Sequence, residues 1–301
     1  MKAVVLTAYG DVDKLVLRDV PEPEPGPSEV KVKVAAASIN PVDWKLRSGG
    51  MQKMMPLQLP AILGRDVSGT VVKVGPGVTG FKTGDKVLGL VHHGYAEYVV
   101  DAQEGFARIP DGLDLQKAAA LPLVVLTGAQ LIEEATRPHK GELVLVTGAV
   151  GAVSRAAVYA ARKLGARVIA GVRAKQKAEA QKLGAEQVVA LDDEGEISRL
   201  PELDAVADTV GGATTEKLLP KIRKGGAVGS VVGEPAGAKG RDLRVKAFLA
   251  HPDSKRLREM AEAVARGELE IPIEKTLPLA QAGEAQKVAE KGGVGKILLV
   301  P

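Results

Sequence analysis

The stretch "LVLVTGAVGAVSRAAVYAARKLGARVIAGVR", residues 143–173, decides the fold of this chain. It begins as an apolar strand, turns at Gly148, continues as a helix of small residues and ends in a second apolar strand before Arg173. A strand, a helix and a strand within about 30 residues are typical of a βαβ unit with parallel strands. We therefore predict a Rossmann-type sheet that binds a dinucleotide at this turn.

The turn carries an incomplete glycine pattern. A dinucleotide-binding turn has three small residues, which here are Ala149, Gly151 and Ser154. Only the middle one must lack a side chain, because the backbone approaches the pyrophosphate there. The helix that follows directs its amides and its positive dipole end toward such an anion. The residues predicted to contact the pyrophosphate are Val150, Gly151, Ala152 and Val153. The alternative is an ordinary strand-to-helix turn without a ligand.

The end of the second strand predicts which cofactor binds. An NAD site places Asp or Glu about 20 residues after the turn, where the acid binds the ribose hydroxyls. Here the strand is followed by Arg173, Lys175 and Lys177, with no acid before Glu179. Cations pair with a 2′-phosphate, so the sequence predicts NADP(H), bound by Arg173 and Lys177. The alternative is a solvated, basic helix start.

The rest of the chain divides into regions with different secondary-structure patterns. The first 120 residues read as short strands separated by Gly- and Pro-rich turns, which indicates a β-rich domain. From residue 121 to residue 249, strand-like and helix-like runs alternate, which indicates a parallel sheet with helices. The tail, residues 250–301, adds two helical patterns and the strand "GKILLV". A length of 301 residues agrees with two domains.

The composition excludes several classes of protein. The chain has no cysteine, which rules out disulfides, thiolate metal sites and a cysteine nucleophile. Its net charge of +4 is spread along the chain and no nucleic-acid-binding module is visible, so no nucleic-acid partner is expected. No run approaches the roughly 18 apolar residues of a membrane span, and no leader pattern precedes the first strand. We expect a cytoplasmic protein without a membrane partner.

Several motifs in a fixed order make nearly the whole chain similar to one known family. They are "AASINPVDWKLRSG", "GRDVSGTVVKVGPGVTGFKTGDKV", "GYAEYVV", "LPLVVLTG", "VTGAVGAVS", "AGVRAKQK", "DAVADTVGG", "GGAVGSVVG" and "GVGKILLVP". The chain resembles the medium-chain dehydrogenase/reductase superfamily, in its zinc-free NADPH:quinone oxidoreductase (zeta-crystallin-like) branch. The resemblance implies an α/β fold: a GroES-like β-rich catalytic domain from residues 1–120 and 250–301, and a Rossmann domain with a doubly wound parallel sheet from residues 121–249. It also implies an active site in the cleft and a homodimer.

The resemblance also implies roles for single residues. Asn40 and Thr127 would lie near the nicotinamide, and Lys177 near the 2′-phosphate. Val231 and Gly233, at the end of the strand "SVVG", would offer backbone groups to the nicotinamide. Two features depart from the family. Many relatives carry Tyr at the position of Leu191, and the segment between residues 233 and 254 looks short.

The metal ligands of zinc members are missing. Those members have Cys at the position of Asn40, and a His-Glu pair at the positions of Arg65 and Asp66. An amide and a guanidinium do not replace a thiolate and an imidazole as zinc ligands, so no metal is expected. The pair His92-His93 has no ligand spacing; it either lines the cleft or belongs to a solvated loop.

The reaction inferred from this resemblance is hydride transfer from NADPH to a quinone or an α,β-unsaturated carbonyl. Without a metal, hydrogen-bond donors must stabilise the charge that develops on the acceptor oxygen. Asn40 is the main candidate, Tyr95 and Lys45 are weaker ones, and the proton comes from a Tyr or from water. Asn40 has an alternative role as a turn-capping residue before Pro41. Two other functions stay open: an NADPH-binding sensor or structural protein with little turnover, and an enoyl-thioester reductase.

Overall fold

The computed structural model describes residues 1–293 and 295–301. Its contacts divide the chain into two compact units, Met1–Leu123 with Pro252–Pro301, and Val124–His251. The domain boundaries expected from the sequence, after residues 120 and 249, stay a prediction. After the roles expected for them from the sequence, we call the first unit the catalytic unit and the second the nucleotide unit.

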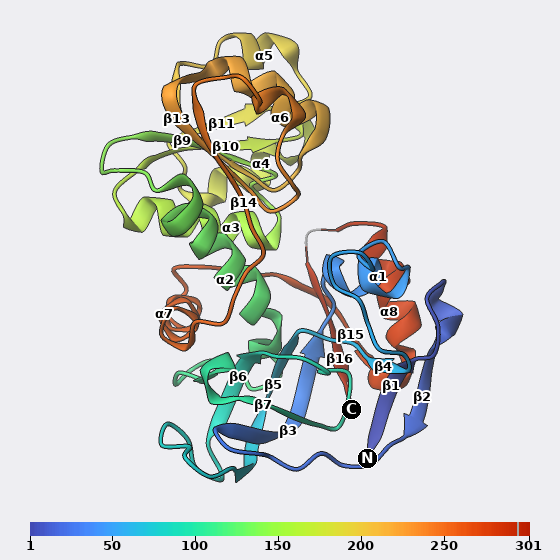
Figure 1. The fold of residues 1–301 in the computed structure, drawn as a ribbon. Coiled ribbons are helices and arrows are strands. Elements are labelled where there is room, and N and C mark those ends of the chain that lie inside the picture. The colour runs from blue at the N-terminus through green and yellow to red at the C-terminus, as the bar shows by residue number, and fades with distance from the viewer. Residues whose placement is uncertain (294) are drawn as a thin grey trace. The chain divides into compact units, whose positions relative to one another are not determined.

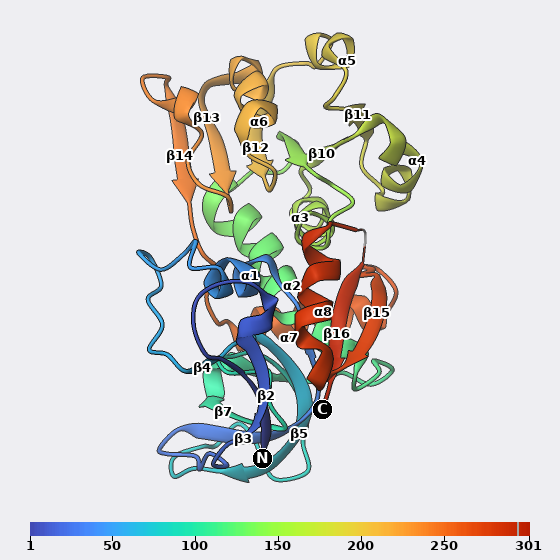
Figure 2. The same ribbon diagram turned by 90° about the vertical axis from the view of Figure 1, so that its right-hand side faces the viewer.

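The nucleotide unit is built on a parallel sheet. Its strand order is β11-β10-β9-β12-β13-β14, with parallel pairing throughout. Figure 2 shows β12, β13 and β14 side by side in this sheet. This order reverses direction between β9 and β12, as in a doubly wound Rossmann sheet, and confirms the predicted fold class. The strands are β9 (Leu143–Thr147), β10 (Arg167–Val172), β11 (Gln187–Ala190), β12 (Leu203–Asp208), β13 (Ile222–Ser230) and β14 (Leu243–Ala247).

Small residues let the helices of this unit pack closely. In α3, Ala156 and Ala157 are buried and lie against Gly128 of α2. A Cβ placed on Gly128 of α2 would collide with the backbone of α3 at Val153 and Ala157, so the glycine in "VLTG" is required by packing. The helices are α2 (Pro122–Gln130), which continues as the π-helix Leu131–Thr136, α3 (Ala152–Lys163), α4 (Lys177–Ala180), α5 (Glu194–Ser198) and α6 (Gly212–Leu218).

The catalytic unit is mainly β structure (Figure 1). One sheet has the order β15-β16-β3-β5-β6-β8, with β7 also paired to β3, and a smaller sheet has the order β2-β1-β4. The strands are β1 (Lys2–Leu6), β2 (Leu15–Asp19), β3 (Glu29–Ser38), β4 (Ala61–Ile62), β5 (Asp66–Val74), β6 (Lys86–Leu90), β7 (Tyr98–Ala102), β8 (Phe106–Arg108), β15 (Ile273–Pro278) and β16 (Lys296–Val300). The helices are α1 (Pro41–Arg47), α7 (Ser254–Ala265) and α8 (Ala282–Glu290).

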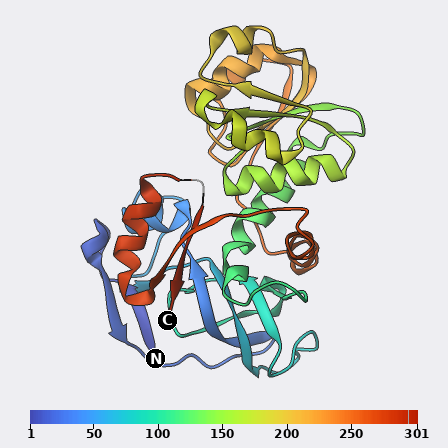
Figure 3. The same ribbon diagram turned by 180° about the vertical axis from the view of Figure 1, so that it is seen from behind.

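The two ends of the chain meet in this unit. Strand β16 pairs antiparallel with β3, with Leu298 opposite Ser38. Helix α8 lies beside the N-terminal strands in Figure 3, where the red and blue segments adjoin, and Arg47 of α1 donates to Gln286 of α8 at 2.7 Å. A shared apolar core from both chain ends, including Val4, Val32 and Leu299, therefore joins them. No helix in the described residues has the length and apolar character needed to cross a bilayer.

Candidate functional site

The turn between β9 and α3 has its left-handed residue at Gly148. Its φ is +59°, and a Cβ there would lie 2.9 Å from Val210. The chain therefore turns at Gly148, and Ala149 is the first of the three small residues that follow the turn. Ala149 is buried, and its amide donates to Gly171 on β10 at 3.0 Å, so it fixes the turn to the sheet.

Gly151 is the N-cap of α3 and has an ordinary φ of −70°. Within 4 Å, a Cβ on this residue would meet a single heavy atom of the described chain, the Gly148 carbonyl oxygen at 3.2 Å. This contact with a backbone oxygen is tight, so a side chain would crowd the turn, and an approaching ligand would be a second reason for glycine here. The amides of Ala152 and Val153 begin the helix, where backbone donors and the helix dipole favour an anion. The residues at this turn fit a bound pyrophosphate.

Ser154 takes the third small position by making hydrogen bonds. Its buried hydroxyl donates to the Thr147 carbonyl at 2.9 Å and lies 2.8 Å from the Thr209 hydroxyl. A serine thus replaces the usual third glycine because the close contact between helix and sheet is polar here. The same bonds tie the turn after β9 to the loop after β12.

Asp208 is the residue of this region that sequence reasoning missed. It is fully buried at the end of β12, and Oδ1 accepts from the hydroxyls of Thr147 and Thr215 and from the amides of Val210 and Gly211. Its carboxylate therefore shapes the loop at the point where the strand order reverses, which is where ligands bind in such sheets. The available signal was an acid that ends the apolar run "LDAVAD".

The predicted 2′-phosphate cations differ from each other. Arg173 is exposed and its guanidinium makes no ion pair with any described residue. Lys177, the first residue of α4, forms a bidentate ion pair with Glu196 at 2.8 and 2.9 Å. Glu179 is bound by the buried Arg155 and by Lys182, so its charge is already compensated.

The other predicted cofactor residues lie in the same unit. Val231 donates its amide to the Asp208 carbonyl at 3.1 Å, and Gly233 has a φ of +106°, which requires a glycine. Thr127 lies on α2 and is 8% exposed. Leu191 is buried against Gly171, so at this position the chain packs its own core.

A buried polar cluster surrounds Asn40 in the catalytic unit. Asn40 Nδ2 donates to Asp66 Oδ2 at 2.8 Å and lies 3.5 Å from the Ser38 carbonyl, while Oδ1 accepts from Lys296 Nζ at 2.6 Å. Lys296 also donates to the Ile39 carbonyl at 2.9 Å and lies 3.6 Å from Asp66. Burial lowers the pKa of Lys296, and the neighbouring carboxylates oppose that effect. The Asn40 side chain is thus oriented by this cluster. Asn40 is also the N-cap residue of α1, and its backbone amide donates to the Asp43 carboxylate at 2.7 Å.

Asp43 and Tyr95 form a second buried pair. The Tyr95 hydroxyl donates to Asp43 Oδ2 at 2.8 Å, and both residues are fully buried. Desolvation raises the pKa of Asp43 to about 7, and Oδ1 of this carboxyl has no hydrogen-bond partner among the described residues. Desolvation and the nearby Asp43 charge raise the pKa of Tyr95 well above its usual value. A phenol that is enclosed and already donating is poorly placed to protonate a substrate, which counts against the catalytic role predicted for Tyr95.

The remaining predicted polar residues lie at the surface. Lys45 is exposed on α1. The His92 ring lies 3.1 Å from Asp101, and the His93 ring lies 3.0 Å from the Ile62 carbonyl, both at exposed positions, which agrees with the solvated-loop interpretation. No cluster of three or more His, Cys, Asp or Glu side chains suited to a metal occurs in the described part of the chain. The prediction of zinc independence still depends on Asn40, Arg65 and Asp66.

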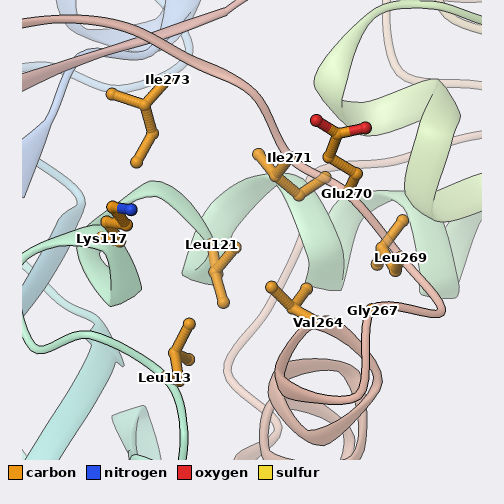
Figure 4. A pocket seen from close by; sticks show the side chains of 9 residues that line it. All are labelled: Leu113, Lys117, Leu121, Val264, Gly267, Leu269, Glu270, Ile271 and Ile273. Carbon is orange, nitrogen blue, oxygen red and sulfur yellow. The ribbon is translucent and has the colours of Figure 1, made fainter.

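An apolar groove of about 320 Å³ lies elsewhere in the catalytic unit, between the end of α7 and the segment before α2 (Figure 4). None of the predicted site residues lines it. Its lining residues are Leu113, Lys117, Leu121, Val264, Gly267, Leu269, Glu270, Ile271 and Ile273.

Comparison with known proteins places this arrangement in context. Residues 26–113 match the alcohol dehydrogenase GroES-like domain, and residues 183–299 match the family described as zinc-binding dehydrogenase. The chain is 32% identical to a quinone oxidoreductase of Pseudomonas aeruginosa, covering 100% of this chain and 99% of the relative. It is 29% identical to a 2-haloacrylate reductase of Burkholderia, covering 99% and 98%. The crystal structure of the Escherichia coli quinone oxidoreductase complexed with NADPH has a TM-score of 0.87, 26% identity and full coverage of both chains.

Proposed function

Because this chain belongs to the quinone oxidoreductase branch of the medium-chain dehydrogenase/reductase superfamily and is an oxidoreductase, we propose that it uses NADPH to reduce a quinone or an α,β-unsaturated carbonyl. The observation that carries the proposal is the β9–α3 turn, where Gly151 and the first amides of α3 can receive a pyrophosphate and the exposed Arg173 directly follows β10.

The nucleotide unit supplies the cofactor site in this proposal. Gly151 and the amides of Ala152 and Val153 hold the pyrophosphate. Arg173 holds the 2′-phosphate, and Lys177 contributes to the extent that its ion pair with Glu196 allows. Thr127 and the backbone of Val231 and Gly233 contact the nicotinamide side. A reductase solved with NADPH shares this fold over its full length, which supports the choice of cofactor.

When bound, NADPH supplies the hydride, so the protein has to bind, orient and stabilise charge. Asn40 is the proposed donor to the acceptor oxygen through the Nδ2 hydrogen that makes only a 3.5 Å contact, because Asp66 holds the other. Its side chain is fully buried, so this role requires it to become accessible to the acceptor when substrate binds. Lys296 and Asp66 hold the amide in one orientation. Because the Tyr95 hydroxyl is committed to Asp43, water is the proposed proton source, and the exposed Lys45 is a weaker second donor.

The proposal includes zinc independence. Asn40, Arg65 and Asp66 stand where zinc members of the superfamily carry metal ligands, and an amide and a guanidinium are poor zinc ligands. We also propose a homodimer in the cytoplasm; β14, which ends the strand order of the sheet, offers an open edge for pairing. Light scattering of the purified protein measures the oligomeric state.

The test is a double substitution at the predicted phosphate site. Arg173→Ala with Lys177→Ala should raise KM for NADPH at least about tenfold and leave KM for NADH nearly unchanged, because charge-assisted bonds to the 2′-phosphate are lost. Equal effects on both cofactors would remove the argument for NADPH. NADPH oxidation with a quinone and with a 2-alkenal tests the reaction, and tight binding of NADPH without turnover on either acceptor would favour a sensor.

A further inference from the structure

Lys177 is already occupied by a carboxylate of the same chain. Its ammonium contacts both oxygens of Glu196, at 2.8 and 2.9 Å. Glu196 Oε2 also accepts the amide of Ala190, at the end of β11, at 2.8 Å. The Glu196 carboxylate is therefore held in place by the backbone as well as by the lysine. It occupies the position at Lys177 that a bound phosphate would otherwise take.

The Glu196 carboxylate stays ionised at neutral pH. The hydrogen bond from the Ala190 amide, followed by the one from Lys177, holds the pKa of Glu196 below its usual value. A 2′-phosphate that reaches Lys177 has to displace this anion or lie beside it, and like charges in contact disfavour binding.

The other charged groups of this region are arranged asymmetrically. Asp192 Oδ1 accepts the amide of Ala174 at 2.8 Å, which adds a second carboxylate close to the end of β10. Glu179 is compensated by Arg155 and Lys182. Arg173 and Lys175 are exposed and form no ion pair within the described residues. Of the two cations predicted to bind the phosphate, Arg173 is thus available and Lys177 is not.

We propose that Glu196 is a specificity-determining residue, which occupies Lys177 in place of the 2′-phosphate and so limits the preference for NADPH over NADH. This inference depends on the proposed function, because it assumes that NADPH binds at the β9–α3 turn. In this arrangement Arg173 provides most of the selection for the phosphate. Glu196, on α5, tunes that selection by competing for Lys177.

Glu196→Gln is the direct test. The amide keeps an acceptor for the Ala190 backbone but removes the charge that holds Lys177. Dissociation constants are measured by calorimetry for NADPH and NADH, and for the fragments 2′,5′-ADP and 5′-AMP, which differ by the phosphate alone. We expect about threefold tighter binding of NADPH and 2′,5′-ADP, and no change for NADH and 5′-AMP.

A matched control lies on the same helix. Glu194→Gln makes the same change of charge, but Glu194 pairs with Lys217 and not with Lys177. It should leave all four dissociation constants unchanged. A gain in NADPH affinity as large in Glu194→Gln as in Glu196→Gln would show a general charge effect and overturn the proposal.

The double variant Lys177→Gln with Glu196→Gln separates the pair from its surroundings. If Glu196 acts through Lys177, the gain from Glu196→Gln disappears when Lys177 is absent. An unchanged ratio of NADPH to NADH affinity in Glu196→Gln would overturn this inference alone. No detectable binding of NADPH to the unaltered protein would instead overturn the proposed function and the inference with it.

Discussion

The two polar regions of this protein differ in where their charges lie. In the nucleotide unit, Arg173 is exposed and the ion pair of Lys177 with Glu196 remains accessible to solvent. In the catalytic unit, Asp66 and Lys296 are buried with Asn40, and their hydrogen bonds join residues up to 257 positions apart. Exposed charges are screened and contribute little to stability, whereas a broken buried pair leaves an uncompensated charge. Substitutions in the first region should therefore change cofactor binding more than stability. Substitutions in the second region should lower the free energy of unfolding.

The largest effect is expected at Lys296. Lys296→Met removes the cation from a buried cluster and leaves Asp66 without its compensating charge. We expect a loss of about 3–5 kcal/mol in the free energy of unfolding, measured by urea denaturation. Lys275→Met, an exposed lysine on the adjacent strand β15, is the control and should change stability by less than about 0.5 kcal/mol. Equal losses in the two variants would contradict the comparison.

A substitution at Gly151 tests the nucleotide unit, where the expected effect is on cofactor affinity and not on stability. Gly151→Val places a side chain over the predicted pyrophosphate position and should weaken NADPH binding about 100-fold through lost bonds to the backbone amides. NADH should be weakened to the same extent, because both cofactors carry the pyrophosphate. Circular dichroism should show an intact fold. Unimpaired binding of both cofactors would place the site elsewhere.

Tyr95 separates a structural role from a catalytic one. Tyr95→Phe removes the hydroxyl that donates to Asp43 and should lower the free energy of unfolding by about 1–3 kcal/mol. If the hydroxyl has no part in proton transfer, kcat and its pH profile stay the same. A loss of kcat beyond about tenfold, with KM unchanged, would restore Tyr95 as the proton donor.

Substitution of Asp43 should give the smallest change in the free energy of unfolding at low pH. That change should depend on pH. The pKa of Asp43 is raised from 3.8 to about 7 in the folded protein, so between these values the folded state holds a proton that the unfolded state has lost. The contribution of Asp43 to stability therefore falls as pH rises from about 4 to about 7 and is level above that. Asp43→Asn removes this dependence and should be nearly neutral at pH 4. The check is the difference in unfolding free energy between the two proteins across pH; a difference that does not vary between pH 4 and pH 7 would refute the raised pKa.

Local sequence patterns were sufficient to predict much of the fold of this protein. The alternation of strands and helices from residue 143 onward predicts the parallel sheet, and the order observed between β11 and β14 confirms it. The absence of an acid before Glu179 and the presence of Arg173 can likewise be read from the sequence. They bear on the cofactor because the β9–α3–β10 unit brings the end of β10 close to the turn after β9. Such features can be derived from sequence since the contacts that matter lie within about 30 residues.

Other features depend on contacts across the sequence and were decided by tertiary structure. The pairing of Lys296 with Asn40 joins the last strand to the first helix. The enclosure of the Tyr95 hydroxyl by Asp43, the capture of Lys177 by Glu196 and the role of Asp208 at the switch in strand order also required the folded chain. Residue type and spacing determine which local elements form. Whether a polar group is free or committed depends on what packing brings beside it, and burial then sets the strength of that interaction.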